Sequence, residues 1–241
     1  MKLKKLFRSM IGETNYGRME YFLRPKLRNG QPLNGQAHRQ RIFSDIVHNF
    51  PLRAIVETGA FRGTTTSFFA RMALPVYAVE INPRFYSYCA MRFRHAKKNV
   101  RISFGDSRSF LKGLWEDPSV PKQSVFFYLD AHWSNDLPLR GEVEMIFSHW
   151  KKSVVMIDDF CVPGTDYGFD SYSPDKTLDL DYLMPVLAAQ KLAVFFPSVD
   201  SSQETGWKRG TAVLCQDDEI MATMEKFDTL RRYPAQVRKI A

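Results

Sequence analysis

The sequence lacks the features that would place it among disulfide-bonded, zinc-binding or membrane-spanning proteins. Its three cysteines, Cys89, Cys161 and Cys215, are scattered over 241 residues and include no Cys-x-x-Cys pair, so we expect free thiols in a reducing compartment. No apolar run is long enough to cross a bilayer. No apolar stretch with a small-residue cleavage site follows the basic N-terminus, so we expect no signal peptide and a cytoplasmic protein.

Two common phosphate-binding signatures are absent as well. Gly59 and Gly63 precede a predicted helix, but Phe61 stands between them where the dinucleotide fingerprint Gly-x-Gly-x-x-Gly requires glycine. The same loop lacks the Lys-Ser/Thr pair of a P-loop. These absences disfavour a dinucleotide oxidoreductase and a P-loop protein.

Basic residues exceed acidic ones, and they gather towards both ends of the chain. The sequence has 34 Lys and Arg against 26 Asp and Glu, a net charge of +8. Such an excess is compatible with binding to a nucleic acid, an anionic membrane surface or an anionic substrate, but charge spread over separate segments is more often solvated surface. We expect residues 1–35 to form a basic appendage, of which residues 1–28 are peripheral to the cofactor site. A short amphipathic helix with Leu3, Leu6 and Phe7 is expected to dock on its own domain. Peripheral membrane contact through this appendage is the alternative. Residues 36–241 are expected to form one domain.

From residue 54 onward, short apolar segments alternate with amphipathic ones. Continuous apolar strands separated by helices are typical of a parallel sheet that is covered on both faces. The pattern predicts an α/β fold, a three-layer sandwich around a mostly parallel, doubly wound sheet of seven strands. The expected strands are 54–56, 76–79, 100–104, 124–129, 153–157, 193–196 and 211–214, with helices at 37–49, 64–72, 83–95, 107–114, 139–150 and 180–190.

Each of the first five expected strands ends in a carboxylate or has one within two residues. In such a sheet, ligands bind beyond the carboxyl ends of the strands, and a buried carboxylate costs stability unless it is paired. Five acidic strand ends in succession therefore indicate a binding site better than a series of helix caps does. The residues are Glu57, Glu80, Asp106, Asp130 and the pair Asp158-Asp159.

The first two strand ends suit a nucleoside that carries a positive charge. Gly59 and Gly63 allow the backbone to approach a ligand at a helix N-terminus. Glu80, about twenty residues further on, is placed to accept both hydroxyls of a ribose. The acidic surroundings disfavour a pyrophosphate, so a cationic sulfonium nucleoside fits better.

On these residues, the stretch 53–159 resembles a class I, Rossmann-like methyltransferase that depends on S-adenosylmethionine (SAM). Glu57-Thr-Gly-Ala-Phe-Arg-Gly63 is similar to motif I of that family, although Phe61 replaces its middle glycine. This variant resembles the metal-dependent O-methyltransferases of macrolide-sugar and glycan modification. The resemblance implies SAM as cofactor, with its amino-acid end at the loop, its ribose at Glu80 and its adenine near Asp106. The implied cofactor-binding residues are Glu57, Gly59, Ala60, Phe61, Arg62, Gly63, Thr64, Thr65, Glu80, Ile81, Asp106, Ser107 and Asp130.

A metal ion is expected beside the cofactor. Asp130, Asp158 and Asp159 lie at the ends of two neighbouring strands and would repel one another unless they are protonated or neutralised by a cation. Carboxylate oxygens suit Mg²⁺ or Mn²⁺, and the resemblance implies the same ligands. His132 follows Asp130 by two residues, and a histidine can remove the hydroxyl proton that O-methylation displaces. We expect His132 and Asp130 to be catalytic, with a metal-free site and a structural histidine as alternatives.

The acceptor is inferred from the segment 161–183, where aromatic and acidic residues suit the face and the hydroxyls of a sugar. We therefore predict methyl transfer to a hydroxyl of a small or saccharide-type acceptor. The alternative, favoured by the basic ends, is a nucleic-acid-binding protein or an RNA methyltransferase. Asp130-Ala-His-Trp133 disfavours this alternative, because it differs from the Asn/Asp-Pro-Pro-Tyr/Phe motif with which many nucleic-acid amino methyltransferases hold a flipped base.

Overall fold

The computed structural model of the protein describes residues 8–94, 99–132, 136–173 and 175–234. The first seven residues of the predicted basic appendage therefore lie outside the described residues. Within the described ranges, no helix combines the length and the apolar character needed to cross a membrane.

One sheet of eight strands runs through the described part of the chain, in the order β3-β2-β1-β4-β5-β7-β6-β8. Strands β1 to β5 are parallel, whereas β7 lies antiparallel to β5, and β6 pairs antiparallel with both β7 and β8. The strand order reverses between β1 and β4. The strands are β1 (Ala54–Thr58), β2 (Val76–Glu80), β3 (Val100–Phe104), β4 (Val125–Leu129), β5 (Val154–Ile157), β6 (Ala193–Pro197), β7 (Ala212–Cys215) and β8 (Leu230–Arg232).

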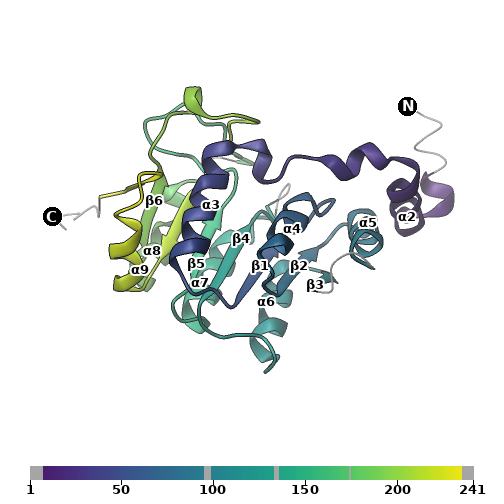
Figure 1. The fold of residues 1–241 in the computed structure, drawn as a ribbon, viewed down its shortest axis with the longest axis horizontal. Coiled ribbons are helices and arrows are strands. Elements are labelled where there is room, and N and C mark those ends of the chain that lie inside the picture. Colours follow the sequence, from purple (N-terminus) through teal and green to yellow (C-terminus); the bar gives the residue numbers. More distant parts are fainter. Residues whose placement is uncertain (1–7, 95–98, 133–135, 174, 235–241) are drawn as a thin grey trace.

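Helices cover both faces of this sheet (Figure 1). Because successive side chains of a strand point to opposite faces, β4 contributes Phe127 and Leu129 to one core and Phe126 and Tyr128 to the other. The first core is closed by α6 (Ser107–Glu116), α7 (Leu139–His149) and α8 (Leu180–Gln190), and the second by α3 (Ala37–Asn49), α4 (Thr64–Phe69) and α9 (Asp218–Met224). The helix α5 (Pro83–Phe93) contributes Cys89 and Phe93 to a smaller core around Ala78 of β2.

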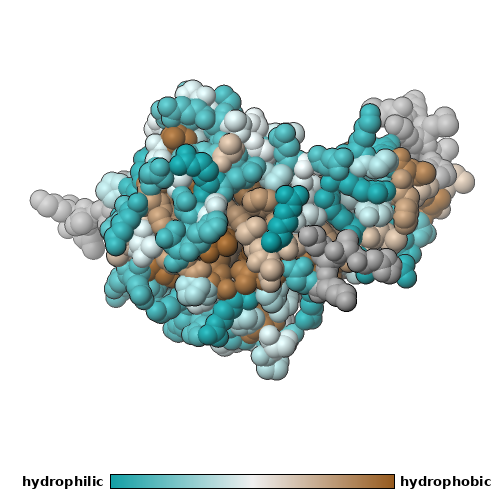
Figure 2. All heavy atoms as spheres, viewed as in Figure 1, coloured by the Kyte–Doolittle hydropathy of each residue, from teal (hydrophilic) through white to brown (hydrophobic). Residues whose placement is uncertain are grey.

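The N-terminal segment lies along the β3 side of the molecule. Its helix α2 (Glu13–Leu23) packs against α5 (Figure 1), and the short 3-10 helices η1 (Pro25–Asn29) and η2 (Leu33–Gly35) lead from α2 to α3. Figure 2 shows hydrophobic surface at this end of the molecule, where Met10, Phe22 and Leu23 are exposed. The domain boundary at residue 35 stays a prediction.

The predicted α/β architecture is confirmed, with one correction to the number of strands. The sequence pattern predicts seven strands, and the sheet has an eighth, β8, at its edge beyond β6. This strand is only three residues long, and its last two residues are exposed. A segment so short and so little buried cannot show the alternation of apolar and polar residues by which strands are recognised.

Candidate active site

The carboxyl ends of β1, β4 and β5 lie side by side at one edge of the sheet. Thr58 is in register with Leu129, and Leu129 is in register with Ile157. The residues that follow these three strands are therefore neighbours in space, as the sequence predicts. This edge includes the point where the strand order reverses, which is where open α/β sheets bind ligands.

The loop between β1 and α4 has a backbone that favours glycine at two positions. Gly59 has a φ of +84°, and a Cβ there would lie 2.1 Å from the carbonyl oxygen of Asp130. Gly63, at φ +69°, precedes α4, and a Cβ there would lie 2.7 Å from the ring of Phe93. The loop is thereby packed tightly against the end of β4, and α4 presents its free N–H groups at this edge of the sheet.

Glu57 is a buried carboxylic acid near the end of β1. Its Oε2 atom has no hydrogen-bond partner among the residues that the structure describes. Burial raises the pKa of Glu57 to about 8, because a low-dielectric environment disfavours the charged form. A buried, unpartnered carboxyl oxygen beside a glycine-containing loop can be satisfied by a ligand that carries a positive charge.

Glu80, at the end of β2, holds the same loop from the side of the sheet. Its Oε2 accepts a hydrogen bond from the backbone N–H of Phe61 at 2.7 Å, and its Oε1 accepts one from Asn82 at 2.7 Å. Burial raises the pKa of Glu80. A carboxylate can accept about four hydrogen bonds, so its capacity for ribose hydroxyls is not used up. The neighbouring Ile81 is 61% exposed and offers an apolar surface beside it.

The remaining predicted loop residues have different surroundings. Ala60 is buried, whereas the guanidinium carbon of Arg62 lies 4.4 Å from the centroid of the Phe61 ring. Thr64 and Thr65 form the first turn of α4. Their proposed contacts with a cofactor stay predictions.

At the end of β3, Asp106 is the N-cap of α6 and accepts hydrogen bonds from the backbone N–H groups of Arg108 (3.0 Å) and Ser109 (3.3 Å). Its carboxylate also binds the Arg108 guanidinium, which lowers the pKa of Asp106. Ser107 is buried beneath this cap. A cavity of about 290 Å³ lies alongside, lined by residues 103–106 and by α6. The capping role does not exclude a contact with adenine, which stays a prediction.

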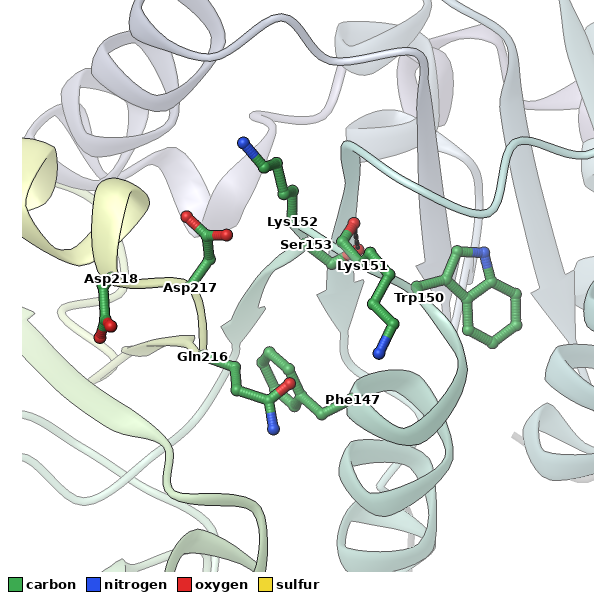
Figure 3. Close-up of a pocket in the computed structure, with 8 residues that line it drawn as sticks. All are labelled: Phe147, Trp150, Lys151, Lys152, Ser153, Gln216, Asp217 and Asp218. Carbon is green, nitrogen blue, oxygen red and sulfur yellow. Dashed lines mark hydrogen bonds between the residues drawn. The ribbon is translucent and has the colours of Figure 1, made fainter.

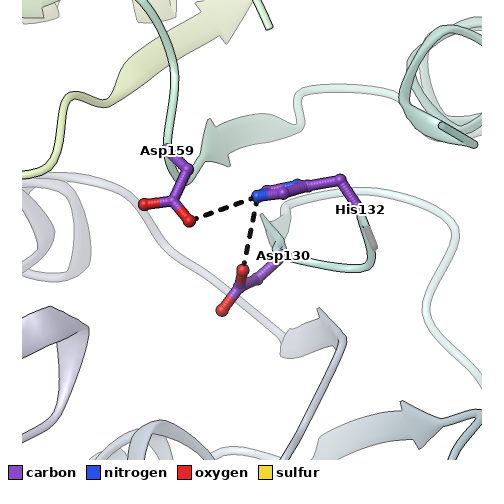
Figure 4. A group of neighbouring side chains, drawn as sticks. All are labelled: Asp130, His132 and Asp159. Carbon is purple, nitrogen blue, oxygen red and sulfur yellow. Dashed lines mark ion pairs between the residues drawn. The ribbon is translucent and has the colours of Figure 1, made fainter. Parts of the chain in front are cut away.

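Asp130, His132 and Asp159 converge at the ends of β4 and β5 (Figure 4), with one ligand atom from each within 4.8 Å of the others. The Nε2 atom of His132 lies 3.6 Å from Oδ1 of Asp130 and 3.5 Å from Oδ2 of Asp159. This nitrogen is buried and has no hydrogen-bond partner within the described ranges. Desolvation, together with the charges of Asp158 and Asp159, raises the pKa of Asp130 well above its ordinary value. Two carboxylates and an imidazole nitrogen at this spacing form a donor set that suits a divalent cation.

Asp158 does not fit its predicted role as a metal ligand. One of its oxygens binds the guanidinium of Arg39 and the backbone N–H of Asp159. The other accepts hydrogen bonds from the hydroxyl of Tyr128 and from the side-chain amide of Asn34 at 2.9 Å. The side chains of Arg39 and Asp158 are almost completely buried. Asp158 therefore pairs with Arg39, and the cluster that could hold a metal ion consists of Asp130, His132 and Asp159.

Arg39 is a residue that the sequence analysis missed. It lies one turn before Ile42 and Phe43 on the apolar face of α3 and is buried with them. Its guanidinium also donates hydrogen bonds to the carbonyl oxygens of Arg209 and Gly210. A charged residue at helical spacing within an apolar face was the available signal, because such a residue is buried only with a partner.

A second missed group links the segment after β5 to the cluster. Asp159 has a left-handed backbone, at φ +53°, which aspartate tolerates better than most residues. The Nε atom of Arg209 donates to its Oδ1 at 2.6 Å, and the same guanidinium binds Asp170. The hydroxyl of Tyr172 reaches both Asp170 (2.9 Å) and the carbonyl oxygen of His132 (3.1 Å). Burial opposes ionisation of Asp159, but His132 and Arg209 outweigh it and lower the pKa.

A larger cavity, of about 440 Å³, lies at the opposite edge of the sheet (Figure 3). It is bordered by residues 150–153, which lead into β5, and by residues 216–218, which follow β7. Its Lys152 pairs with the exposed Glu219 at 2.9 Å. This cavity is separated by the length of the sheet from the acidic strand ends, so size alone does not identify the site.

No model of a protein family matches the sequence, and no curated protein matches it. Solved structures match the fold. An O-methyltransferase from Bacillus cereus, in complex with SAH (S-adenosylhomocysteine, which is SAM without its methyl group), has a TM-score of 0.58 and 17% sequence identity, over 82% of this chain and 90% of that chain. A candidate O-methyltransferase from Klebsiella pneumoniae has a TM-score of 0.55 and 15% identity, over 89% and 95%. The O-methyltransferase TomG from Streptomyces achromogenes, involved in tomaymycin synthesis and in complex with SAM, has a TM-score of 0.54 and 17% identity, over 74% and 78%.

These likenesses cover most of each chain. In this chain the strand order reverses between β1 and β4, and the acidic strand ends lie near this point. The chain therefore has the fold of the class I SAM-dependent methyltransferases.

Proposed function

We propose that the protein is a SAM-dependent methyltransferase that acts on a hydroxyl of a small or saccharide-type acceptor. The observation that carries the proposal is Glu57, a buried acid with an unpartnered oxygen beside the Gly59–Gly63 loop. SAM carries an ammonium group and a sulfonium, and it supplies the methyl group from the latter. Glu57 would bind the ammonium group, Glu80 the ribose hydroxyls, and the apolar surface of Ile81 the base.

The acceptor would lie on the far side of the cofactor, over Asp130 and His132. The polar groups there, including Arg209 and Asp170, suit an acceptor with several hydroxyls. Of the aromatic residues predicted to face a sugar, Tyr167 is buried, whereas Phe169 is 42% exposed. The enzyme's own contribution would be to orient the acceptor hydroxyl and to remove its proton.

Asp130, His132 and Asp159 would hold a divalent cation, Mg²⁺ or Mn²⁺. The fit rests on the Nε2 atom of His132, which has no partner among the described residues, and on the raised pKa of Asp130. A cation would bind this nitrogen and would favour the charged form of Asp130. A bound cation of this kind lowers the pKa of an oxygen acid next to it. His132 then has two alternative roles, as a ligand or as the base that takes the hydroxyl proton, and the two roles predict different outcomes when it is replaced.

The proposed activity can be tested by incubating the protein with SAM and a panel of saccharides, other small hydroxyl compounds and RNA. Mass spectrometry should find one saccharide or small molecule heavier by a single CH₂, with SAH formed in equal amount. An Asp130→Asn variant should form neither product. Methyl transfer to RNA alone would support the nucleic-acid alternative instead.

Cofactor binding should release a proton from Glu57. Below pH 8 the free protein holds this carboxyl in its neutral form, because its pKa is about 8, whereas an ammonium group beside it favours the anion. Affinity for SAH should therefore rise with pH, by up to about tenfold per unit, and level off above pH 8. At pH 7, calorimetry in two buffers of different ionisation enthalpy should detect close to one proton released per SAH.

A Glu57→Gln variant should bind SAH with no such proton release, whereas Glu144→Gln, an exposed acid on α7, should behave as the wild type. If the wild type binds SAH equally well at pH 6 and pH 8 without releasing a proton, then Glu57 does not contact the ammonium group.

A further inference from the structure

Glu20, on the N-terminal helix α2, is a buried acid surrounded by arginines. Its side chain has no exposed surface. The Nε atom of Arg84 donates to its Oε2 at 2.9 Å, and a second nitrogen of Arg84 binds its Oε1. Arg62 lies 3.6 Å from the same Oε1, and Arg24 lies 3.4 Å from it. One carboxylate therefore joins three elements: α2, the start of α5, and the loop that precedes α4.

Arg62 belongs to the loop predicted to hold the cofactor. Its guanidinium lies over the rings of Phe61 (4.4 Å) and Phe85 (5.0 Å). Its backbone carbonyl accepts a hydrogen bond from Arg92 at 2.9 Å, and Arg92 also binds the carbonyl of Arg28, in the N-terminal segment, at 2.9 Å. The loop is thus tied to the N-terminal segment through both the side chain and the backbone of Arg62.

The same segment reaches the first turn of α4. The backbone N–H of Leu33 donates to the hydroxyl of Thr65 at 3.2 Å. A Cβ on Gly30 would lie 3.0 Å from the hydroxyl oxygen of Thr64, so the side chain of Thr64 packs closely against the backbone of Gly30. Residues 20–33 therefore contact Arg62 in the loop and Thr64 and Thr65 in the first turn of α4, while Glu80 holds Phe61 from the side of the sheet.

The packing of α2 on α5 leaves no room for a side chain at Gly17. A Cβ there would lie 2.1 Å from the carbonyl oxygen of Arg84. Glycine inside a helix costs about 1 kcal/mol relative to alanine. Gly17 therefore makes α2 itself less stable, but it allows α2 and α5 to approach closely. The contact also places Arg84 where Glu20 can bind it.

We propose that residues 17–33 form part of the cofactor site by fixing residues 61–65, the end of the loop and the first turn of α4, and that Glu20 is a positioning residue acting through Arg62. This inference rests on the proposed function, since it concerns the same cofactor. It departs from the expectation that the basic N-terminal appendage is peripheral to the ligand site. A preformed loop lowers the ordering cost of binding. A substitution that loosens the loop should therefore lower the affinity for the cofactor, although it removes no group that touches the cofactor.

The test compares Glu20→Gln with Glu13→Gln, a matched change on the same helix, where Glu13 forms a local ion pair with Arg8. Glu20→Gln should weaken SAH binding about tenfold, the loss of one charge-assisted contact, and should speed amide hydrogen exchange at residues 61–65 in the free protein. Glu13→Gln should change neither. In a double-mutant cycle, Glu20→Gln added to Arg62→Met should weaken binding no further than Arg62→Met alone.

Gly17→Ala provides a second variant that keeps every charge. It should separate α2 from α5 and reproduce both the weaker binding and the faster exchange, although alanine is the better helix former. Unchanged SAH affinity and unchanged loop exchange in folded Glu20→Gln or Gly17→Ala protein would overturn the proposal, whatever the loss of thermal stability. Failure of the wild type to bind SAH would instead refute the proposed function, and loop exchange would still decide the role of Glu20.

Discussion

Removal of divalent cations with EDTA is expected to abolish methyl transfer, and added Mg²⁺ or Mn²⁺ is expected to restore it. Asp130 and Asp159 face the same imidazole nitrogen, and the pKa of Asp130 is raised by desolvation and by the neighbouring carboxylates. A cation would neutralise this cluster and lower the pKa of an acceptor hydroxyl beside it. Cofactor binding should survive chelation, because Glu57 and Glu80 belong to different strand ends from the cluster.

Variants at the two adjacent aspartates should separate metal binding from stability. Asp159→Asn should raise the metal concentration needed for half-maximal activity. Asp158→Asn should change that concentration much less than Asp159→Asn does, and it should lower the free energy of unfolding by about 3 kcal/mol or more, because it leaves the buried Arg39 without its charged partner. Glu144→Gln should do neither. Full activity after exhaustive removal of metal ions would show that the cluster works without one.

Replacement of His132 by alanine is expected to lower kcat by about 10²- to 10⁴-fold, the usual contribution of a general base. Affinity for SAH should stay near the wild-type value, since the imidazole faces Asp130 and Asp159. Raising the metal concentration distinguishes the two alternative roles. A ligand variant should regain activity as the metal saturates, whereas a variant that lacks the base should not.

His48→Ala is the matched control for this variant. His48 is exposed near the end of α3, and its ring binds the serine one turn earlier, so kcat should not change. If His132→Ala retains the wild-type kcat at every metal concentration, then His132 is a structural residue and the hydroxyl proton is removed by another group.

The sheet was predictable from the sequence because its central strands β1, β4 and β5 are buried on both faces and are mostly continuous apolar runs. The convergence of Glu57, Asp130 and Asp159 followed from the topology alone, because parallel strands end at one edge. The partners of these residues did not follow, since they come from distant parts of the chain. Arg39 binds Asp158 across 119 positions and Glu20 binds Arg84 across 64, and no local pattern records either pair.

Two adjacent aspartates show where the sequence pattern stopped being informative. Asp158 and Asp159 are equivalent in composition and spacing, yet Asp158 is buried against Arg39 whereas Asp159 turns towards His132 through a left-handed backbone. Likewise, Glu142 and Glu144 both lie near the start of α7, but Glu142 is buried, with an oxygen that has no hydrogen-bond partner among the described residues, and Glu144 is exposed. Only the packing of neighbouring elements decides which member of each pair lies inside.

Calorimetric titration of the protein with SAH and with NAD tests the central claim most directly. We expect one SAH to bind per chain and NAD not to bind, because the Glu57–Gly63 loop offers an acid to a cationic ligand and lacks the dinucleotide glycine pattern. Binding of NAD with equal or greater affinity, and no binding of SAH, would contradict the assignment of this fold to methyl transfer.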